Sequence, residues 1–411
     1  MVVRADNRDV AVTGLGLVTP AGIGVEPSWA RILDAVPAAA ADPALAGMPV
    51  DFDCTVPGFD ADERIGRRQA WRTDRFEHLG IVAAREAIGD AGLDPGSWSA
   101  ARVAVVIGTA LGGTLTFERQ QRNLAIGGPG EVSSLLIPMA ATNMVAGYIA
   151  IDCGATGPNL VTTTACASGA TAIGTARDLL LRDACDVVIT GGVEACLSPT
   201  IVAAFTRMKA LSRRGGDPAA ASRPFDSDRD GFVIAEGAGI LVLERVGDAR
   251  ARGARVRARL SGYGASADAY HPTAPDPNGS GAARAIHAAL ADAGIGPAEV
   301  DHVNAHGTST PQGDLAEGRM LRRVLSGRAA VTSTKGVIGH TLGAAGAIEA
   351  ACTVLAVQHG VIPPTANLDS LDRRIEVDVV SKMPRYRPVD VAISNSFGFG
   401  GQNAVLVVTA N

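Results

Sequence analysis

The sequence predicts an α/β protein with buried, near-continuous apolar strands. Short runs of β-branched residues alternate with longer stretches rich in alanine and leucine, which is the pattern of strands and helices that follow one another along a chain. Several of the short runs end in glycine-containing turns, and two distant helical stretches closely resemble each other. These observations favour one large composite fold with an internal duplication.

The predicted strands are marked by uninterrupted apolar runs. They lie at residues 10–12, 102–107, 187–190 and 239–243 and around Val303. Glycine-containing turns follow at residues 14–16, 108, 191–192 and 307. Because ligands tend to bind at strand ends in open α/β sheets, we expect the chemistry of the protein at these turns.

Two helical stretches indicate that the chain consists of two related halves. Residues 165–181 and 340–357 are both rich in small residues, apolar on nearly every face and preceded by a segment rich in threonine and serine. A helix without a polar face is buried in the core of a large protein. We therefore predict two halves, residues 1–254 and 255–411, and interpret the polar stretch 213–229 as a loop.

Composition and charge argue against several classes of protein. The 411 residues include 37 basic and 42 acidic ones, a net charge of -5, whereas nucleic-acid-binding domains are usually basic. Six scattered cysteines without paired spacing argue against a zinc site or a disulfide framework and fit a reducing compartment. Neither a signal peptide nor a long run of large apolar side chains is evident. We expect a cytoplasmic protein that binds no metal, nucleic acid or membrane.

Cys166 is the candidate nucleophile. It lies where an apolar extended run meets the predicted buried helix, in the sequence TTTACASG at 162–169. At such a helix N-terminus the dipole and free backbone N–H groups favour a thiolate and can hold an oxyanion. A small core residue is the alternative reading of a buried cysteine.

Other polar residues could assist a thiol. His306 and His340 lie in glycine-rich turns, and histidine is the side chain best suited to move protons near pH 7. Lys335 is one of only three lysines, so its retention suggests a task that arginine cannot perform, although a solvated ion pair remains the alternative. Asp314 and Glu317 are candidate partners for it. The turn NSFGFGG at 395–401 is either a gate over a ligand or a tight turn between strands.

Four motifs in order carry a resemblance to a known family. They are TACASG at 164–169, NAHGTSTPQGD at 304–314, STKGVIGHTLGAAG at 333–346 and NSFGFGG at 395–401. With them, essentially the whole chain resembles the β-ketoacyl-acyl carrier protein synthases of the synthase II type, the condensing enzymes of type II fatty-acid or polyketide synthesis. The resemblance implies the thiolase fold, a five-layered αβαβα sandwich made of two duplicated halves, in a dimer.

The resemblance also implies a reaction and roles for the residues. Cys166 would take an acyl group from a thioester, and malonyl-acyl carrier protein would then lose CO₂ and attack it in a decarboxylative Claisen condensation. His306 and His340 would stabilise the enolate oxygen, and Lys335, tied to Glu317, would hold the electrostatics of the pair. The backbone N–H groups of Cys166 and Phe399 would form the oxyanion hole, with Phe399 as a gate.

Further matches concern the substrates. Thr308 and Thr310 match positions that bind the phosphopantetheine arm of an acyl carrier protein, and no cofactor bound by the enzyme itself is implied. An acyl pocket limited by bulky side chains is implied for Leu111, Leu136 and Phe205. A basic patch for the carrier protein is implied for Arg68, Arg72 and Lys209, although Trp71 stands where a further basic residue is expected.

Several readings stay open. A thiolase is disfavoured because the last cysteine, Cys352, is far from the C-terminus. The chain could be a homodimeric synthase, or a catalytic subunit active only in a heterodimer with a chain-length factor. A non-catalytic partner subunit is disfavoured by the presence of Cys166, His306 and His340. Fatty-acid elongation and polyketide or polyene assembly use the same residues, with a slight preference here for the latter.

Overall fold

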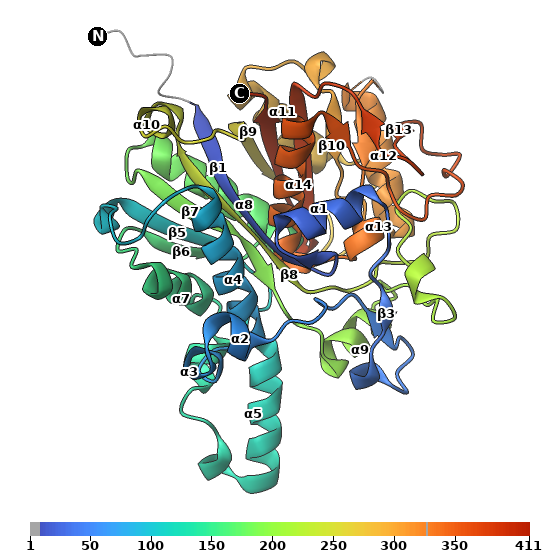
Figure 1. Ribbon diagram of the computed structural model, residues 1–411. Helices are drawn as coiled ribbons and strands as arrows, with labels where there is room; N and C mark the ends of the chain where they lie inside the picture. The colour runs from blue at the N-terminus through green and yellow to red at the C-terminus, as the bar shows by residue number, and fades with distance from the viewer. Residues whose placement is uncertain (1–8, 326–327) are drawn as a thin grey trace.

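Strands joined in one continuous hydrogen-bonded order form the framework of the computed structural model, which describes residues 9–325 and 328–411 (Figure 1). They divide into two β-sheets, one for each half of the chain. In the first sheet the strands follow the order β6 (Asn159–Thr162), β5 (Val103–Gly108), β7 (Val187–Glu194), β8 (Gly237–Arg245) and β1 (Val10–Thr19). In the second the order is β13 (Asp378–Val379), β11 (Ala330–Thr332), β10 (His302–Asn304), β15 (Val391–Gly398), β16 (Gln402–Thr409) and β9 (Ala258–Ala267).

Helices form three layers around these sheets. The outer face of the first sheet is covered by α4 (Arg75–Asp90) and α7 (Met144–Cys153), and that of the second by α11 (Ser280–Ala293) and α12 (Pro311–Leu325). Between the sheets lie α8 (Ser168–Leu181) and α14 (Ala345–His359). The expected five-layered αβαβα sandwich is therefore present, because each sheet buries both of its faces.

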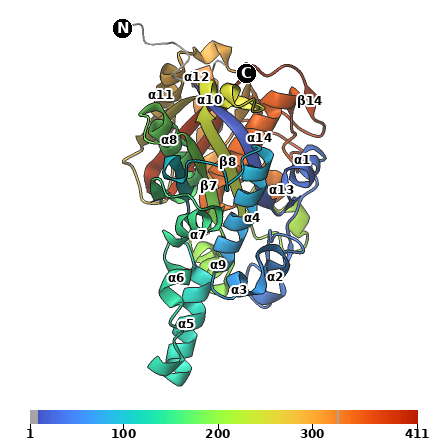
Figure 2. The same ribbon diagram turned by 60° about the vertical axis from the view of Figure 1, so that its left-hand side comes forward.

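The remaining elements lie at the edges of the sandwich. The helices are α1 (Val25–Leu33), α2 (Ala61–Ile65), α3 (Arg67–Ala70), α5 (Thr114–Gly127), α6 (Leu136–Ala140), α9 (Pro199–Arg207), α10 (Val246–Ala251) and α13 (Lys335–Ile338). The short strands are β2 (Gly22–Ile23), β3 (Ala40–Ala41), β4 (Phe52–Asp53), β12 (Val361–Ile362) and β14 (Arg385–Tyr386). Helix α5 projects from the body as an arm, with α6 packed against it (Figure 2).

Both halves of the chain repeat one topology. In the first, β5 pairs in parallel with β6 and β7, while β8 pairs antiparallel with β7 and β1. In the second, β10 pairs in parallel with β11 and β15, while β16 pairs antiparallel with β15 and β9. Counted along the chain, equivalent strands therefore occupy equivalent places, and the duplication inferred from two helices extends to both sheets.

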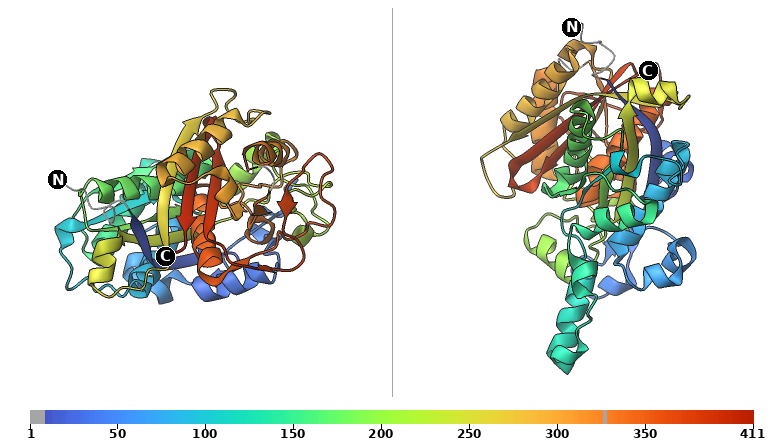
Figure 3. Two further views of the ribbon diagram at one scale, coloured as in Figure 1. Left: turned by 90° about the horizontal axis from the view of Figure 1, so that it is seen from above. Right: turned by 90° about the vertical axis from the view of Figure 1, so that its left-hand side faces the viewer.

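The two sheets meet at their edges. The first residues of β1 pair antiparallel with β9, Val10 opposite Leu260 and Val12 opposite Ala258, so that the hydrogen-bonded ladder continues from one half to the other. Seen from above, the strands of the second half lie side by side with those of the first half (Figure 3). The predicted boundary at residues 254 and 255 falls between α10 and β9.

Two of the predicted glycine turns lie inside strands instead. Residues 14–16 belong to β1 and residues 191–192 to β7. A Cβ added at Gly14 or Gly16 would lie 2.1 Å or 1.9 Å from a carbonyl oxygen of α4, so these glycines allow the helix backbone to pack directly on the strand. Gly108 is the last residue of β5 and Gly307 follows the end of β10, so these two do lie at strand ends, as predicted.

The central helices are buried almost completely. Between the sheets α14 exposes little beyond its last two residues, and its lone acidic residue, Glu349, is 1% exposed. Among the described residues, the segment Leu342–His359 alone has the length and apolar composition of a membrane span, but 89% of it is buried inside the protein. It is a core helix between two sheets.

Candidate active site

Cys166 is held in a strained turn at the start of α8. It occupies the middle of a 3-10 turn, Ala165–Ala167, and Ala165 adopts a left-handed φ of 50° although it is not a glycine. The Ser168 hydroxyl fixes the turn by donating to the Ala165 carbonyl at 2.6 Å and accepting the Thr164 N–H at 2.9 Å. The cysteine is thus presented from a rigid backbone.

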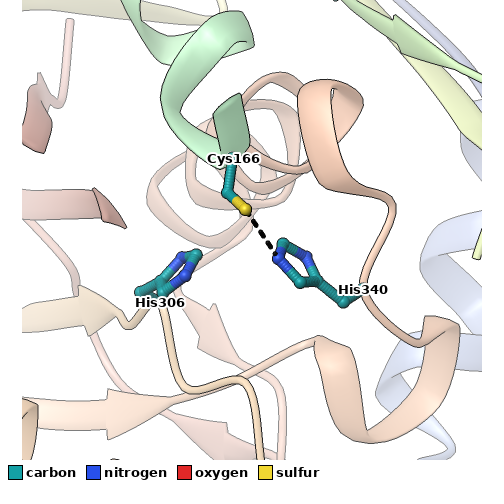
Figure 4. Close-up of side chains that lie close together, drawn as sticks. All are labelled: Cys166, His306 and His340. Carbon is teal, nitrogen blue, oxygen red and sulfur yellow. Dashed lines mark hydrogen bonds between the residues drawn. The ribbon is translucent and has the colours of Figure 1, made fainter. Parts of the chain in front are cut away.

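The structure brings Cys166, His306 and His340 together (Figure 4). His340 Nε2 lies 3.1 Å from Cys166 Sγ, and the two imidazole rings are 5.4 Å apart and nearly perpendicular. His306 follows β10 and His340 follows α13, so the second half supplies both histidines to the cysteine of the first. One thiol and two imidazoles are therefore aimed at a common point.

Burial controls the protonation of all three groups. It raises the pKa of the Cys166 thiol to about 11, although the positive charge of Lys335 and the N–H of Phe399 lower it. This outcome differs from the expected thiolate: desolvation outweighs the helix terminus. Burial holds the pKa of His306 and of His340 well below the ordinary value, and the positive charge of Lys335 lowers both further. At neutral pH the site holds a thiol beside two neutral imidazoles.

Lys335 has a different partner from the one expected. Its ammonium pairs with Glu349, and both side chains are 1% exposed. Glu317 instead accepts the backbone N–H groups of His306 and Gly307 at 2.9 and 2.8 Å. The register of α14 explains the difference, because it places Glu349 between the sheets facing Lys335. A single acidic residue in a helix without a polar face was the sequence signal for this partner.

Asp314 also supports backbone rather than Lys335. Its carboxylate accepts the N–H of Phe225 at 2.7 Å and of Ser309 at 3.1 Å, and Arg229 lies 3.5 Å away. Together Asp314 and Glu317 hold the loop that carries His306, because each binds N–H groups of that loop. Sequence reasoning did not single out Phe232, whose ring packs edge-on against His340 at 5.3 Å.

A cavity of about 530 Å³ leads to the cysteine. Its walls include most of the residues predicted to contact substrates: Leu111, Phe205, Lys209, Thr308, Thr310 and Phe399. The Thr308 and Thr310 hydroxyls lie 3.0 Å apart on one wall, and the rings of Phe205 and Phe399 contact each other at 6.3 Å. A cavity of this volume is typical of a site for a small molecule.

Three predicted residues lie outside this cavity. Leu136 is on α6 in the projecting arm, and Arg68 and Arg72 lie at α3, exposed on the surface beside Trp71, which is 70% exposed. Helix α5, against which α6 packs, points away from the body (Figure 1), and Leu136 is not among the residues that line the cavity.

The three reactive groups also carry atoms that could bind a metal. Their sulfur and nitrogen atoms lie within 4.8 Å of one another. Two properties oppose a bound cation: the thiol would have to lose a proton that burial holds, and the charge of Lys335 acts on all three groups. The arrangement suits nucleophilic chemistry better than metal binding.

Two family models cover most of the chain. Residues 7–249 match the N-terminal domain of β-ketoacyl synthases, and residues 257–369 match the C-terminal domain. The chain belongs to the β-ketoacyl synthase family. The four motifs that suggested this family and the cluster of Cys166 with two histidines agree with that membership.

Relatives of this family align along nearly the full length. The chain is 44% identical over 408 residues to 3-oxoacyl-[acyl-carrier-protein] synthase 2 of Synechocystis sp., with 98% of each chain covered. Among solved structures it is similar to the ishigamide ketosynthase/chain length factor, with a TM-score of 0.92 and 34% identity over 98% of this chain and 99% of that one. It is also similar to a type II PKS ketosynthase solved in complex with its acyl-carrier protein, with a TM-score of 0.90, 31% identity and the same coverage. The fold is therefore that of the ketosynthases, as expected.

Proposed function

We propose that this chain is a β-ketoacyl-acyl carrier protein synthase that extends an acyl chain by decarboxylative Claisen condensation. The observation that carries the proposal is the contact of 3.1 Å between Cys166 Sγ and His340 Nε2, with His306 facing the same point at the base of a cavity. Family membership and the named relatives support the same reaction.

The first half-reaction would load the cysteine. His340 takes the proton of the Cys166 thiol, the sulfur attacks the acyl thioester carbonyl, and the carrier thiol leaves with a proton as the new thioester forms. Because the thiol pKa is about 11, a neutral imidazole in contact with Sγ is needed for this step at neutral pH. The N–H groups of Cys166 and Phe399 would hold the oxyanion.

The second half-reaction would form the carbon–carbon bond. Malonyl thioester loses CO₂, the electrons of the broken bond form an enolate, and its carbon attacks the acyl carbonyl while Cys166 leaves as the thiolate. His306 and His340 are suited to hydrogen-bond the enolate oxygen because burial keeps them neutral. Thr308 and Thr310 would hold the phosphopantetheine arm. Both substrates arrive as thioesters, so the reaction needs no cofactor held by the enzyme.

Several assignments of partners and substrates belong to this proposal. Arg68, Arg72 and Lys209 are exposed cations on an acidic chain and would attract an acidic acyl carrier protein. Leu111 and Phe205 would limit the acyl chain, with Phe399 as the gate. Leu136, which does not line the cavity of its own chain, would take part from the arm of a second subunit, which favours a dimer. We place the enzyme in the cytoplasm and divide it into halves at residues 254 and 255.

The alternative is a catalytic subunit that depends on a chain-length-factor-like partner. One solved relative is the ishigamide ketosynthase/chain length factor, which keeps this reading open. A non-catalytic partner subunit is less favoured because the thiol and both histidines are present and in contact. Polyketide or polyene assembly and fatty-acid elongation share the proposed chemistry.

Intact-mass analysis after exposure to acyl-loaded carrier protein tests the proposal. We expect wild-type protein to gain the mass of one acyl group, and Cys166→Ala to gain none while it keeps its circular dichroism spectrum. An acylated Cys166→Ala protein would contradict the assignment of the nucleophile. Cys196→Ala is the matched control, because it removes another buried thiol from the same hydrophobic cluster and should leave the acylation intact.

A further inference from the structure

The turn that carries Cys166 has a counterpart in the second half. The 3-10 turn Leu342–Ala344 precedes α14 as Ala165–Ala167 precedes α8, and a threonine comes before each turn. The first residue of each turn is a non-glycine residue with a left-handed φ, 50° in the first half and 44° in the second. In this correspondence Gly343 is the counterpart of Cys166.

The packing of the two central helices supports this correspondence. A Cβ at Gly169 would lie 2.8 Å from the N of Ala347, and a Cβ at Gly346 would lie 2.8 Å from the N of Ala170. Each helix therefore meets the other at the equivalent residue. The two turns are related as the two halves are.

The strands beside these turns end in different residues at the equivalent last position. Strands β7 and β15 are both eight residues long and end at Glu194 and Gly398. Gly398 lies against the nucleophile turn, where a Cβ would be 3.2 Å from the N of Cys166. In the other half, the Glu194 carboxylate accepts the N–H of Gly343 at 3.1 Å. The proposed oxyanion N–H is thus left open by a glycine, while its counterpart is occupied by a carboxylate.

Glu194 binds a second segment with the same carboxylate. It accepts the N–H of Ala110 at 2.8 Å, the N–H of Leu111 at 3.1 Å and the hydroxyl of Thr109 at 3.2 Å, and it is fully buried. Ala110 and Leu111 line the cavity beside Cys166. Gly343 lies three residues after His340. One buried carboxyl group therefore joins the wall of the acyl pocket to the segment that carries a histidine.

We infer that Glu194 is a positioning residue. Its internal carboxylate is bound in the counterpart of the oxyanion site and holds the Leu111 wall in register with His340. In this way Glu194 determines which acyl chains reach Cys166. This inference rests on the proposed function for its effect on acyl chains. A carboxylate offers about four acceptor sites, which match three N–H groups and one hydroxyl. A neutral amide would turn its NH₂ group toward N–H donors.

The first test compares acyl chains of graded length on wild type, Glu194→Gln, Glu194→Ala and the control Glu244→Gln. Glu244 is another buried acid, 2% exposed, which bonds Thr13 and Arg252 away from the cavity. We expect both Glu194 variants to slow acylation by long chains about tenfold more than acetylation, and Glu244→Gln to leave the ratio unchanged. Equal slowing of all chains by the Glu194 variants would overturn the inference.

The second test does not depend on turnover. If Glu194 fills an anion site, its removal leaves backbone N–H groups that a small carboxylate can bind. We expect sodium formate, compared with sodium chloride at equal ionic strength, to raise the unfolding temperature of Glu194→Ala and partly restore its chain-length ratio, with no such effect on wild type or Glu194→Gln. A folded Glu194→Ala that ignores formate would overturn the anion site. Wild-type protein that gains no acyl group would instead contradict the proposed function. The formate test would still decide whether Glu194 occupies an anion site.

Discussion

At the scale of single residues, the state of the Cys166 thiol decides how the site must work. Burial raises its folded pKa from 9.0 to about 11, so the neutral thiol is favoured by the native protein. A raised pKa contributes stability that is complete below the unfolded pKa and is lost as the pH rises toward the folded one. The enzyme therefore stores a protonated nucleophile, and His340 has to remove the proton.

This linkage predicts an alkaline window of stability loss. Between pH 9 and pH 11 wild type should lose about 2–3 kcal/mol of unfolding free energy more than Cys166→Ala, which lacks the titrating thiol. Urea unfolding of both proteins at several pH values measures the difference. The comparison cancels the other buried cysteines, which both proteins keep. Parallel profiles for the two proteins would show that the thiol is not held neutral by burial.

The buried pair of Lys335 and Glu349 allows charge to be separated from packing. Replacing one partner, as in Lys335→Met or Glu349→Leu, leaves an unpaired buried charge and should cost about 3–5 kcal/mol of stability. The double variant removes both charges and should recover most of that loss. Because it also removes the positive charge that acts on Cys166 and both histidines, we expect it to stay folded but to condense slowly. Condensation at the wild-type rate in the double variant would show that Lys335 is only structural.

At the scale of elements, the central helices hold the site because they cross at glycines. A Cβ at Gly346 would lie 2.6 Å from Ser396 Oγ and 2.8 Å from the N of Ala170, so α8 and α14 could not keep their separation. We expect Gly346→Ala to lower the unfolding free energy by about 1–3 kcal/mol and to slow acylation by displacing the turn of Cys166. Gly89→Ala in α4, where a Cβ has no neighbour within 4 Å, should instead be neutral or stabilise by about 0.5 kcal/mol. Urea titration distinguishes the two variants.

Elements also show what the sequence could and could not predict. The alternation of strands and helices, the paired central helices and the three reactive residues were predictable because periodicity and ordered motifs are local in the chain. The partner of Lys335 was not, since the choice between Glu317 and Glu349 depends on the register between α13 and α14. Nor could the sequence distinguish glycines in turns from glycines inside β1, which allow the backbone of α4 to pack closely on the strand. Such close approaches are set by packing between distant segments.

At the scale of the whole molecule, duplication gives the two halves different tasks. The first half supplies the nucleophile and the wall at Leu111, and the second supplies both histidines and the segment of Phe399. The residues from the two halves meet where α8 and α14 cross. Neither half alone therefore has a complete site. The same topology therefore yields one active turn at Cys166 and one inactive turn at Gly343.

The surface of the arm and of β6 has the features that we expect of the proposed subunit interface. Ile126, Ile137 and Ile151 are 82%, 70% and 73% exposed on α5, α6 and α7. Strand β6 is at the end of the strand order, next to β5, among the residues that the structure describes. Apolar side chains beside an open strand edge are typical of a subunit interface. Leu136 lies on the same arm, outside the cavity of its own chain. A second subunit would cover the exposed apolar side chains and the strand edge, and its cavity would receive Leu136.

We therefore expect the purified chain to sediment as a homodimer. Ile126→Asp combined with Ile137→Asp should convert it to a folded monomer whose acylation by long chains falls more than its acylation by acetyl groups, because the wall from the partner arm is lost. Leu136→Ala should change the chain-length profile without breaking the dimer. Ile137 and Leu136 are neighbours on the same arm. The aspartate substitutions test assembly, whereas Leu136→Ala tests the shape of the pocket. A wild-type monomer that acylates only after a chain-length-factor-like subunit is added would establish the heterodimer instead, with this chain as its catalytic half.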